Sequence, residues 1–376
     1  MTRPSTRMQN ANRFKLGLFA TNCSGGLAMT KVPECWIASW DNALAANQLA
    51  EAAGLEFTLP IARWHGYRGE TDAEGSTYET LTWAAGTVAA TDEIVVFGTV
   101  HVPFLNPVFA AKMMVTADHI GRGRFGLNIV SGWNEGEFNM FGTRLLEHDE
   151  RYAYSEEWIE ISEEWIEIVN RIWAEEAPFD FKGKYFDMTG VQSRPKPHGG
   201  GRPLVLSAGS SPAGRAFAMR HADCLFMIIV DIESLAKETA SIRAIRDTGE
   251  ENDAGIYCIS HVVCRPTQKE AEEYYHYYVH DMGDWEAAEH LLQIRQGQQQ
   301  SIPPERFAQI KERFVSGLAT YPVVGSPDRV AEAFHDLNKA GIDGMAFGLV
   351  NYIDELPYFR DEVLPRMVRL GLREAA

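Results

Sequence analysis

Short apolar segments alternate with longer helix-like segments along nearly the whole chain, and this alternation limits the possible folds more than any other feature. The predicted strands cover residues 14–20, 55–59, 94–99, 124–130, 204–208, 224–229, 256–264 and 344–349. The predicted helices cover residues 39–53, 76–90, 107–120, 156–173, 212–221 and 357–370. A helix between two strands returns the chain to its starting edge, so the strands run parallel. About eight such strands predict an α/β fold with a closed TIM (β/α)8 barrel, and a doubly wound open sheet is the alternative.

Residues at the predicted helix ends support these boundaries. Gly54 follows the first helix, and Ser76 with Glu79 three residues later is a candidate capping box. Asn106-Pro107 combines a capping side chain with proline at the first helical position. These signals predict helix starts next to Ser76 and at Pro107.

Three long segments interrupt the alternation, at residues 132–151, 179–202 and 274–314. Long segments after barrel strands lie at the carboxyl ends of the strands, so we expect all three at that face, as walls and a lid of an active site. No low-complexity linker divides the chain. The sequence therefore predicts one barrel domain over residues 1–376 with these insertions.

The chain is acidic, with a formal net charge of -17. Such a surface repels nucleic-acid phosphates, so neither DNA nor RNA is expected as a partner. Residues 1–14 are polar and do not resemble a secretory signal, and no run of 18 apolar residues could cross a membrane. The five cysteines show no CxxC spacing. We expect core thiols in a cytoplasmic protein that does not contact a membrane.

Several catalytic motifs are missing from the sequence, which has no GxxxxGK[ST] phosphate loop and no HExxH pair. His276 and His280 are four residues apart, a spacing that can bind a metal on a helix. No third ligand accompanies them. An exposed helix face is therefore predicted there, and no metal.

One apolar strand contains an amide, because Asn128 lies in the run 123–133 (Gly-Arg-Phe-Gly-Leu-Asn-Ile-Val-Ser-Gly-Trp). A buried amide needs hydrogen-bond partners, so such a residue normally faces a ligand or a polar network. A turn-forming asparagine at the end of the strand is the alternative.

A second candidate site is the turn after strand 204–208, where Ser210 and Ser211 lead into helix 212–221. Free backbone N–H groups at a helix start suit a phosphate, and barrels often bind phosphate near their later strands. An ordinary helix cap is the alternative.

Aromatic and basic side chains follow the second and third predicted strands. Residues 61–67 (Ile-Ala-Arg-Trp-His-Gly-Tyr) follow the second, and Thr99-Val100-His101 ends the third. Such a composition indicates a pocket for a planar ligand, and packing at the barrel rim is the alternative.

Together these segments resemble the bacterial luciferase-like flavin-dependent monooxygenases over nearly the full chain. The resemblance rests on Ser24-Gly25-Gly26, the run 123–133, the run 147–152 (Glu-His-Asp-Glu-Arg-Tyr), residues 181–186 with Pro195-Lys196-Pro197, and the turn 208–211. The most similar branch holds pyrimidine monooxygenase, dimethylsulfone monooxygenase and riboflavin lyase.

The resemblance implies a two-component monooxygenase that uses reduced FMN and O2 on a small substrate, either heteroatom-containing or heteroaromatic. In that branch oxygen is directed to the N5 position of the flavin. A separate NAD(P)H:flavin reductase and a homo-oligomer, either a dimer or a tetramer, are also implied. The alternatives on the same barrel are a riboflavin lyase-type or dehalogenating oxygenase, a deazaflavin-dependent oxidoreductase and a non-catalytic flavin-binding protein.

The resemblance also assigns roles to individual residues. The implied cofactor-binding residues are Ala62, Arg63, Asn128, Glu137, Arg151, Tyr152, Ser210 and Ser211. The expected oxygen pocket consists of Thr99 and Asn128, with Val100 and Val130 as apolar neighbours. His101 and His65 are candidate acid–base groups, because imidazole titrates near working pH. The expected substrate contacts are Trp64, Tyr67, Val130 and Trp133.

Overall fold

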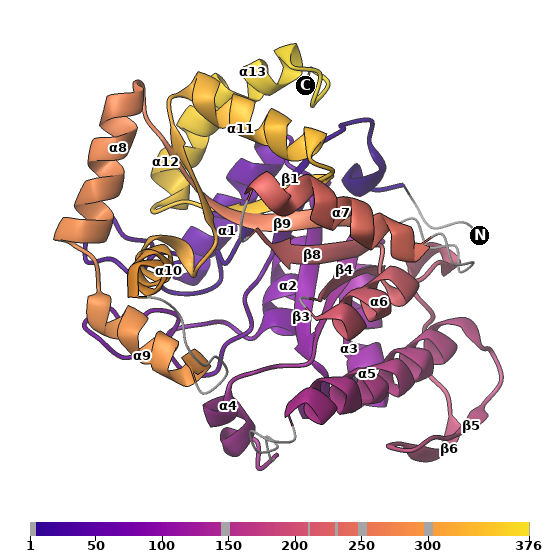
Figure 1. Ribbon diagram of the computed structural model, residues 1–376. Coiled ribbons are helices and arrows are strands. Elements are labelled where there is room, and N and C mark those ends of the chain that lie inside the picture. Colours follow the sequence, from indigo (N-terminus) through magenta and orange to yellow (C-terminus); the bar gives the residue numbers. More distant parts are fainter. Residues whose placement is uncertain are drawn as a thin grey trace.

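Eight parallel strands form a closed barrel (Figure 1). The computed structural model describes residues 5–143, 151–209, 211–229, 232–246, 254–296 and 304–375, without the side chains of 151–157, 246, 296 and 304–307. In barrel order the strands are β1 (Lys15–Phe19), β2 (Phe57–Leu59), β3 (Val95–His101), β4 (Phe125–Val130), β7 (Leu204–Ala208), β8 (Cys224–Ile228), β9 (Gly255–Cys264) and β11 (Gly344–Gly348). Pairing of β8 with β9 and of β11 with β1 closes the ring. The predicted barrel and its eight strands are confirmed, and the open-sheet alternative is wrong.

Helices surround the barrel on its outside (Figure 1). Those that follow barrel strands include α1 (Trp40–Ala52), α2 (Thr80–Ala89), α3 (Pro107–Ile120), α6 (Pro212–His221) and α7 (Ile232–Arg246), and α11 (Pro327–Lys339) precedes the last barrel strand. The bounds of α3 and α6 are those predicted, because capping side chains fix their first turns. Asn106 accepts a hydrogen bond from the Val108 N–H at 2.9 Å, and Ser211 accepts one from the Gly214 N–H at 3.1 Å.

Three helices begin several residues from their predicted starts, and one of them is α5 (Arg151–Ala174), which starts at 151 rather than 156. Helix α2 starts at Thr80 because its cap is Glu79, not Ser76, and the Glu79 carboxylate accepts from the first free backbone N–H groups of the helix. The predicted helix 357–370 starts earlier, at α12 (Tyr352–Tyr358), where Asn351 is the cap. It continues through a π-helical turn, Phe359–Val363, into α13 (Leu364–Arg369).

Aromatic rings fill the interior of the barrel. The Phe57 ring meets the rings of Phe97 and Tyr257 edge-on, with both pairs of centroids 5.9 Å apart. Glycines make room for these rings, because a Cβ at Gly17 would lie 2.5 Å from the Phe57 ring and one at Gly126 2.5 Å from the Phe97 ring. This packed layer places any ligand site above it, at the carboxyl ends of the strands.

A group of helices stands beside that end of the barrel (Figure 1). It consists of α8 (Gln268–His276), α9 (Trp285–Gln296) and α10 (Pro304–Gly317), followed by strand β10 (Tyr321–Gly325). The sequence did not predict these elements individually. Their apolar side chains form a second hydrophobic cluster with residues from the loops after β1 and β2, such as Met29 and Tyr67. The segment follows the carboxyl end of β9, so the structure places 274–314 at the predicted face.

The segment 132–151 also leaves the barrel at this face, after β4. It contains α4 (Glu135–Met140). Residues 144–150 lie outside the described part of the chain.

The segment 179–202 lies at the opposite end of the barrel from the predicted one. It follows α5 (Arg151–Ala174), which returns the chain from the mouth, and it forms a hairpin of β5 (Phe179–Lys182) and β6 (Asp187–Val191) before β7. The His198 N–H donates to Asp118 at 2.8 Å, near the carboxyl-terminal end of α3. The prediction is wrong because this segment precedes a barrel strand rather than following one.

The cysteines are free thiols, and all except the partly buried Cys35 are buried. Burial raises the pKa of each thiol, as expected for core residues. Within the described ranges, no helix is both long and apolar enough to cross a membrane.

Candidate functional site

Thr99 and Asn128 form a hydrogen-bonded pair at the ends of adjacent strands. They are register partners in β3 and β4, and the Asn128 amide donates to the Thr99 hydroxyl at 3.0 Å. The Thr99 hydroxyl donates in turn to the carbonyl of Pro60 at 2.8 Å. Asn128 is only 6% exposed, and its Oδ1 atom has no partner among the residues that the structure describes. An acceptor in this position is available for the N–H group of a ligand.

The expected oxygen pocket does not include Val100. Side chains alternate between the two faces of a strand, so Thr99 and His101 share the inner face and Val100 lies on the outer one. Val100 accordingly packs in the cluster between strands and helices. Val130 is two residues from Asn128 and therefore shares its inner face.

Arg63 is held between two carboxylates. Its Nε atom lies 2.7 Å from Glu74, and a terminal nitrogen lies 3.0 Å from Glu137 in α4. Glu137 also accepts from the Trp64 N–H at 3.0 Å. The side chains of all three ionic residues are at most 7% exposed. Burial disfavours the cation, but Tyr67 and the two carboxylates outweigh it and keep the pKa of Arg63 above its usual value. The loop after β2 is therefore fixed to α4 at the mouth.

Two predicted substrate residues pack against this ion cluster. The guanidinium carbon of Arg63 lies 5.2 Å from the ring centroid of Trp133 and 5.6 Å from that of Tyr67. Trp133 is partly exposed, whereas Tyr67 is only 1% exposed and belongs to the second hydrophobic cluster. Tyr67 thus packs against Arg63 from the side of the second hydrophobic cluster. Ala62, beside Arg63 in the loop, is partly exposed.

Trp64 belongs to an aromatic wall at the mouth. It is 41% exposed and meets the Phe141 ring edge-on, with centroids 4.7 Å apart. Phe141 stacks on Phe104 at 4.3 Å, and Phe104 meets His101 at 5.3 Å. These rings give one side of the mouth an apolar, aromatic surface.

The two candidate acid–base histidines differ in their surroundings. Burial, reinforced by the charge of Arg63, lowers the pKa of His101 to about 3. His101 is therefore a neutral hydrogen-bonding group at ordinary pH rather than an acid. The Nδ1 atom of His65 lies 3.0 Å from the Gly66 carbonyl, and a Cβ at Gly136 would meet its Nε2 atom at 2.7 Å. His65 thus packs against the start of α4.

Ser211 begins α6 at the next strand around the barrel from β4. Gly209 is required there, because a Cβ on it would lie 2.5 Å from the backbone of Gly214. This close approach brings the turn after β7 onto the free N–H groups of the helix. Ser210 and the side chains of Arg151 and Tyr152 lie outside the described residues.

Sequence reasoning missed three polar residues of this region. Glu74 binds Arg63, and Asn22 ties the loops after β1 and β2 together through the backbone of Ile61. Arg295, near the end of α9, lies over the Trp133 ring. No local motif marks any of them, because each one acts through partners distant in the sequence.

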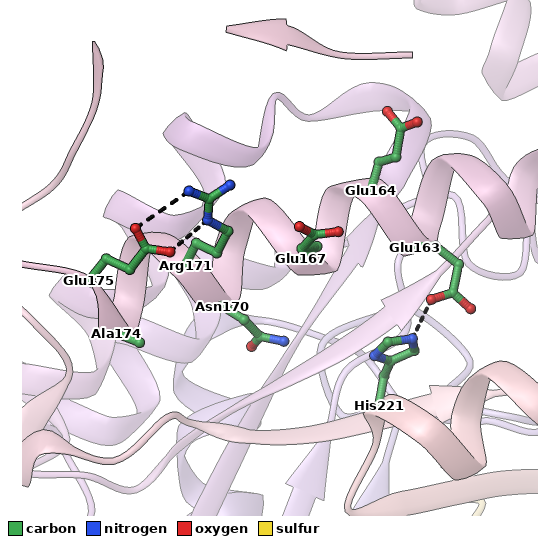
Figure 2. A pocket seen from close by; sticks show the side chains of 8 residues that line it. All are labelled: Glu163, Glu164, Glu167, Asn170, Arg171, Ala174, Glu175 and His221. Atoms are coloured by element: carbon green, nitrogen blue, oxygen red, sulfur yellow. Dashed lines mark hydrogen bonds and ion pairs between the residues drawn. The ribbon is translucent and has the colours of Figure 1, made fainter. Parts of the chain in front are cut away.

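Elsewhere, a surface cavity of about 410 Å³ lies along α5 (Figure 2). Four of its lining side chains form ion pairs with one another, Glu163 with His221 and Glu175 with Arg171 at 2.6 Å. His276 and His280 also have carboxylate neighbours, Asp281 and Glu312. The described ranges contain no group of three or more side chains that could hold a metal ion.

Comparisons with known proteins agree with this barrel. The luciferase-like monooxygenase family model matches residues 14–344. An FMNH2-dependent dimethylsulfone monooxygenase of Pseudomonas fluorescens (strain Pf0-1) is 30% identical over 364 residues, which are 93% of each chain. Pyrimidine monooxygenase RutA of Bradyrhizobium sp. is 34% identical over 235 residues, 60% of this chain and 61% of that protein. A crystal structure of riboflavin lyase has a TM-score of 0.83 at 23% identity, covering 97% of this chain and 93% of that one.

The chain belongs to the luciferase-like monooxygenase family. Its predicted enzyme class, flavin-dependent monooxygenase, is that of the family and is confirmed.

Proposed function

We propose that this protein is the oxygenase of a two-component system that takes reduced FMN from a separate NAD(P)H:flavin reductase. It uses O2 to oxygenate a small heteroatom-containing or heteroaromatic compound. The observation that carries the proposal is the Oδ1 atom of Asn128, which is buried at the mouth without a partner in the described structure. The FMNH2 dependence of the dimethylsulfone monooxygenase relative gives further support.

The residues at the mouth fit FMN in two respects. Asn128 offers an acceptor for a flavin N–H, next to the apolar rings after β3 and β4. The turn at Gly209 and Ser211 offers a helix start, where free N–H groups and the helix dipole favour a phosphate. We assign Arg151, Tyr152 and Ser210 to the same phosphate, and Ala62, Arg63 and Glu137 to the edge of the isoalloxazine ring.

The chain contributes positioning and the exclusion of water. Bound reduced FMN would supply the electrons that O2 activation requires. Thr99 holds the Asn128 amide in one orientation through its bond to Pro60, and Oδ1, unpaired among the described residues, remains free to accept from a ligand. Trp64, Val130 and Trp133 supply apolar surface for the substrate and keep water from the reacting atoms. His101, neutral by burial, accepts or donates a hydrogen bond without adding charge.

The test combines the purified protein with FMN, NADH and a flavin reductase under ¹⁸O2. Dimethylsulfone, uracil and riboflavin form the first substrate panel, since relatives act on these classes. We expect one labelled oxygen atom in a product, and tighter binding of reduced than of oxidised FMN. FMNH2 oxidation that gives only hydrogen peroxide with every substrate of a wider screen would contradict an oxygenase. Tight binding of a deazaflavin in place of FMN would favour the deazaflavin-dependent alternative.

A further inference from the structure

Arg295, at the edge of the site, has no anionic partner among the residues that the structure describes. It belongs to the last turn of α9, in the helical segment beside the barrel mouth. Its guanidinium carbon lies 4.6 Å from the Trp133 ring centroid and 5.2 Å from that of Phe314. Its Nε atom is buried and has no hydrogen-bond acceptor, and no carboxylate in the described ranges pairs with it.

Arg63, which contacts the same tryptophan ring, shows how another buried cation of this site is neutralised. Arg63 is bound by both Glu74 and Glu137. In place of carboxylates, Arg295 has the faces of two aromatic rings. Cation–π contacts replace only a small part of the hydration that a buried guanidinium loses. Burial lowers the pKa of Arg295, and Tyr67 opposes this effect. The charge of Arg63 lowers this pKa further, and the Glu74 carboxylate offsets part of the shift. The donors of this guanidinium thus remain available for an acceptor that the described residues do not supply.

The phosphate of FMN is not the group that fits there. The helix start assigned to the phosphate is that of α6, and Figure 1 shows α6 and α9 on opposite sides of the barrel. Trp133 follows the strand that carries Asn128, so an acceptor bound to Arg295 would lie on the substrate side of the mouth.

We propose that Arg295 binds an oxyanion of the substrate, a carboxylate or sulfonate, while the apolar part of the substrate lies on Trp133. This inference rests on the proposed function and specifies its substrate class as small organic anions. A guanidinium fork matches the two oxygens of such a group, and the partner-free, desolvated position strengthens the bond. Neutral substrates of the same shape leave the cation unpaired, which gives selectivity against them.

The test measures binding without turnover, so it does not depend on oxygenation. Isothermal titration in saturating FMN compares two matched pairs, methanesulfonate with dimethylsulfone and orotate with uracil. In the wild-type protein we expect the anion of at least one pair to bind about tenfold or more tightly than its neutral partner, as for one charged hydrogen bond. Arg295→Met should remove this preference, and Arg295→Lys should keep part of it.

The control variant is Arg68→Met, which removes an exposed charge from the loop after β2 and should leave the preference unchanged. Melting temperature and FMN affinity are measured for every variant, and both should match the wild type. An anion preference that survives Arg295→Met, or that is absent from both pairs in the wild-type protein, would overturn the proposal. So would a loss of FMN affinity in Arg295→Met with unchanged anion binding. Failure of ¹⁸O incorporation alone would count against the proposed function and leave this result standing.

Discussion

The two ends of the Asn128 amide have different surroundings. Its nitrogen donates to Thr99, and its oxygen has no donor among the described residues. A residue that served packing alone would leave neither end open, because an unmet buried acceptor costs about 1–3 kcal/mol. The difference between the two ends indicates that Thr99 orients the amide and that the oxygen meets a ligand.

We therefore predict that Asn128→Ala and Thr99→Val uncouple flavin oxidation from product formation. Reduced flavin that is not held correctly reacts with O2 in an unproductive way, so hydrogen peroxide should rise as product per NADH falls. Product, peroxide and melting temperature are measured side by side.

The matched control is Thr58→Val in β2, which also removes a buried hydroxyl with one backbone partner, Leu18. Thr58→Val should cost about 1 kcal/mol of stability, the usual value of one hydrogen bond, and Thr99→Val about 2 kcal/mol because its hydroxyl makes two. Only Thr99→Val should release peroxide. If coupling per bound flavin stays complete in both site variants, Asn128 binds the flavin edge and has no part in oxygen handling.

Individual residues of the site differ in how well the sequence could identify them. Asn128 was predictable because an amide inside an apolar strand is conspicuous. Glu74 and Glu137 are 11 and 74 residues from the Arg63 side chain that they bind, and only Glu137 received a role, through the family resemblance. Val100 was misassigned because adjacency in sequence was given more weight than the two-residue period of a strand.

Among the elements, helix α6 combines a structural and a proposed binding role in one residue. Ser211 caps the helix and stands at the proposed phosphate site. We predict that Ser211→Asp separates the two roles, because aspartate caps as well as serine but repels a phosphate. FMN affinity should fall about 10- to 150-fold, equivalent to about 1.5–3 kcal/mol. Riboflavin affinity should not change. Fluorescence titration of both flavins measures this.

Ser39→Asp is the control, at the capped start of α1. It should leave the affinities for both flavins and the melting temperature unchanged. Equal weakening of FMN and riboflavin by Ser211→Asp would remove this helix start from the phosphate site.

At the level of elements, prediction succeeded where a capping side chain directly precedes a proline that begins the helix. Asn106 and Ser211 gave correct starts for α3 and α6. It failed for the hairpin β5–β6, whose position depends on α5 having returned the chain to the far end of the barrel. It also missed α8, α9 and α10, because their apolar faces pack against loops rather than against the barrel and follow no regular alternation with strands.

At the scale of the whole molecule, two buried histidines make the unfolding free energy depend on pH. Burial is the main cause that lowers the pKa of both His101 and His261 to about 3. In the unfolded chain an imidazole binds a proton near pH 6.5. Below that pH the unfolded state takes up protons that the native state does not, so the unfolding free energy must fall as the pH drops towards 3.

We predict that each of these histidines lowers the unfolding free energy by about 1.4 kcal/mol for every unit by which the pH falls between pH 5.5 and 4. Urea unfolding of the flavin-free protein at several pH values gives the slope. His101→Gln and His261→Gln should each reduce the slope by one such contribution, while the titration of carboxylates remains common to all three proteins. A slope identical to that of the wild type in either variant would show that this histidine is protonated in the native state.

Strand β9 has two sets of neighbours along its length. Gly255–Ile259 pairs with β8 as part of the barrel, and Ser260–Cys264 pairs with β10 beyond it. The helical segment that carries Arg295 lies between β9 and β10 in sequence. Because β10 pairs with β9, a continuous ladder of backbone hydrogen bonds joins the C-terminal end of that segment to the barrel. A segment attached in this way is expected to keep a fixed position beside the barrel rather than to move as a lid. We expect ligands to enter and leave through local side-chain movements, and selection among substrates to depend on the shape and charge of a preformed opening.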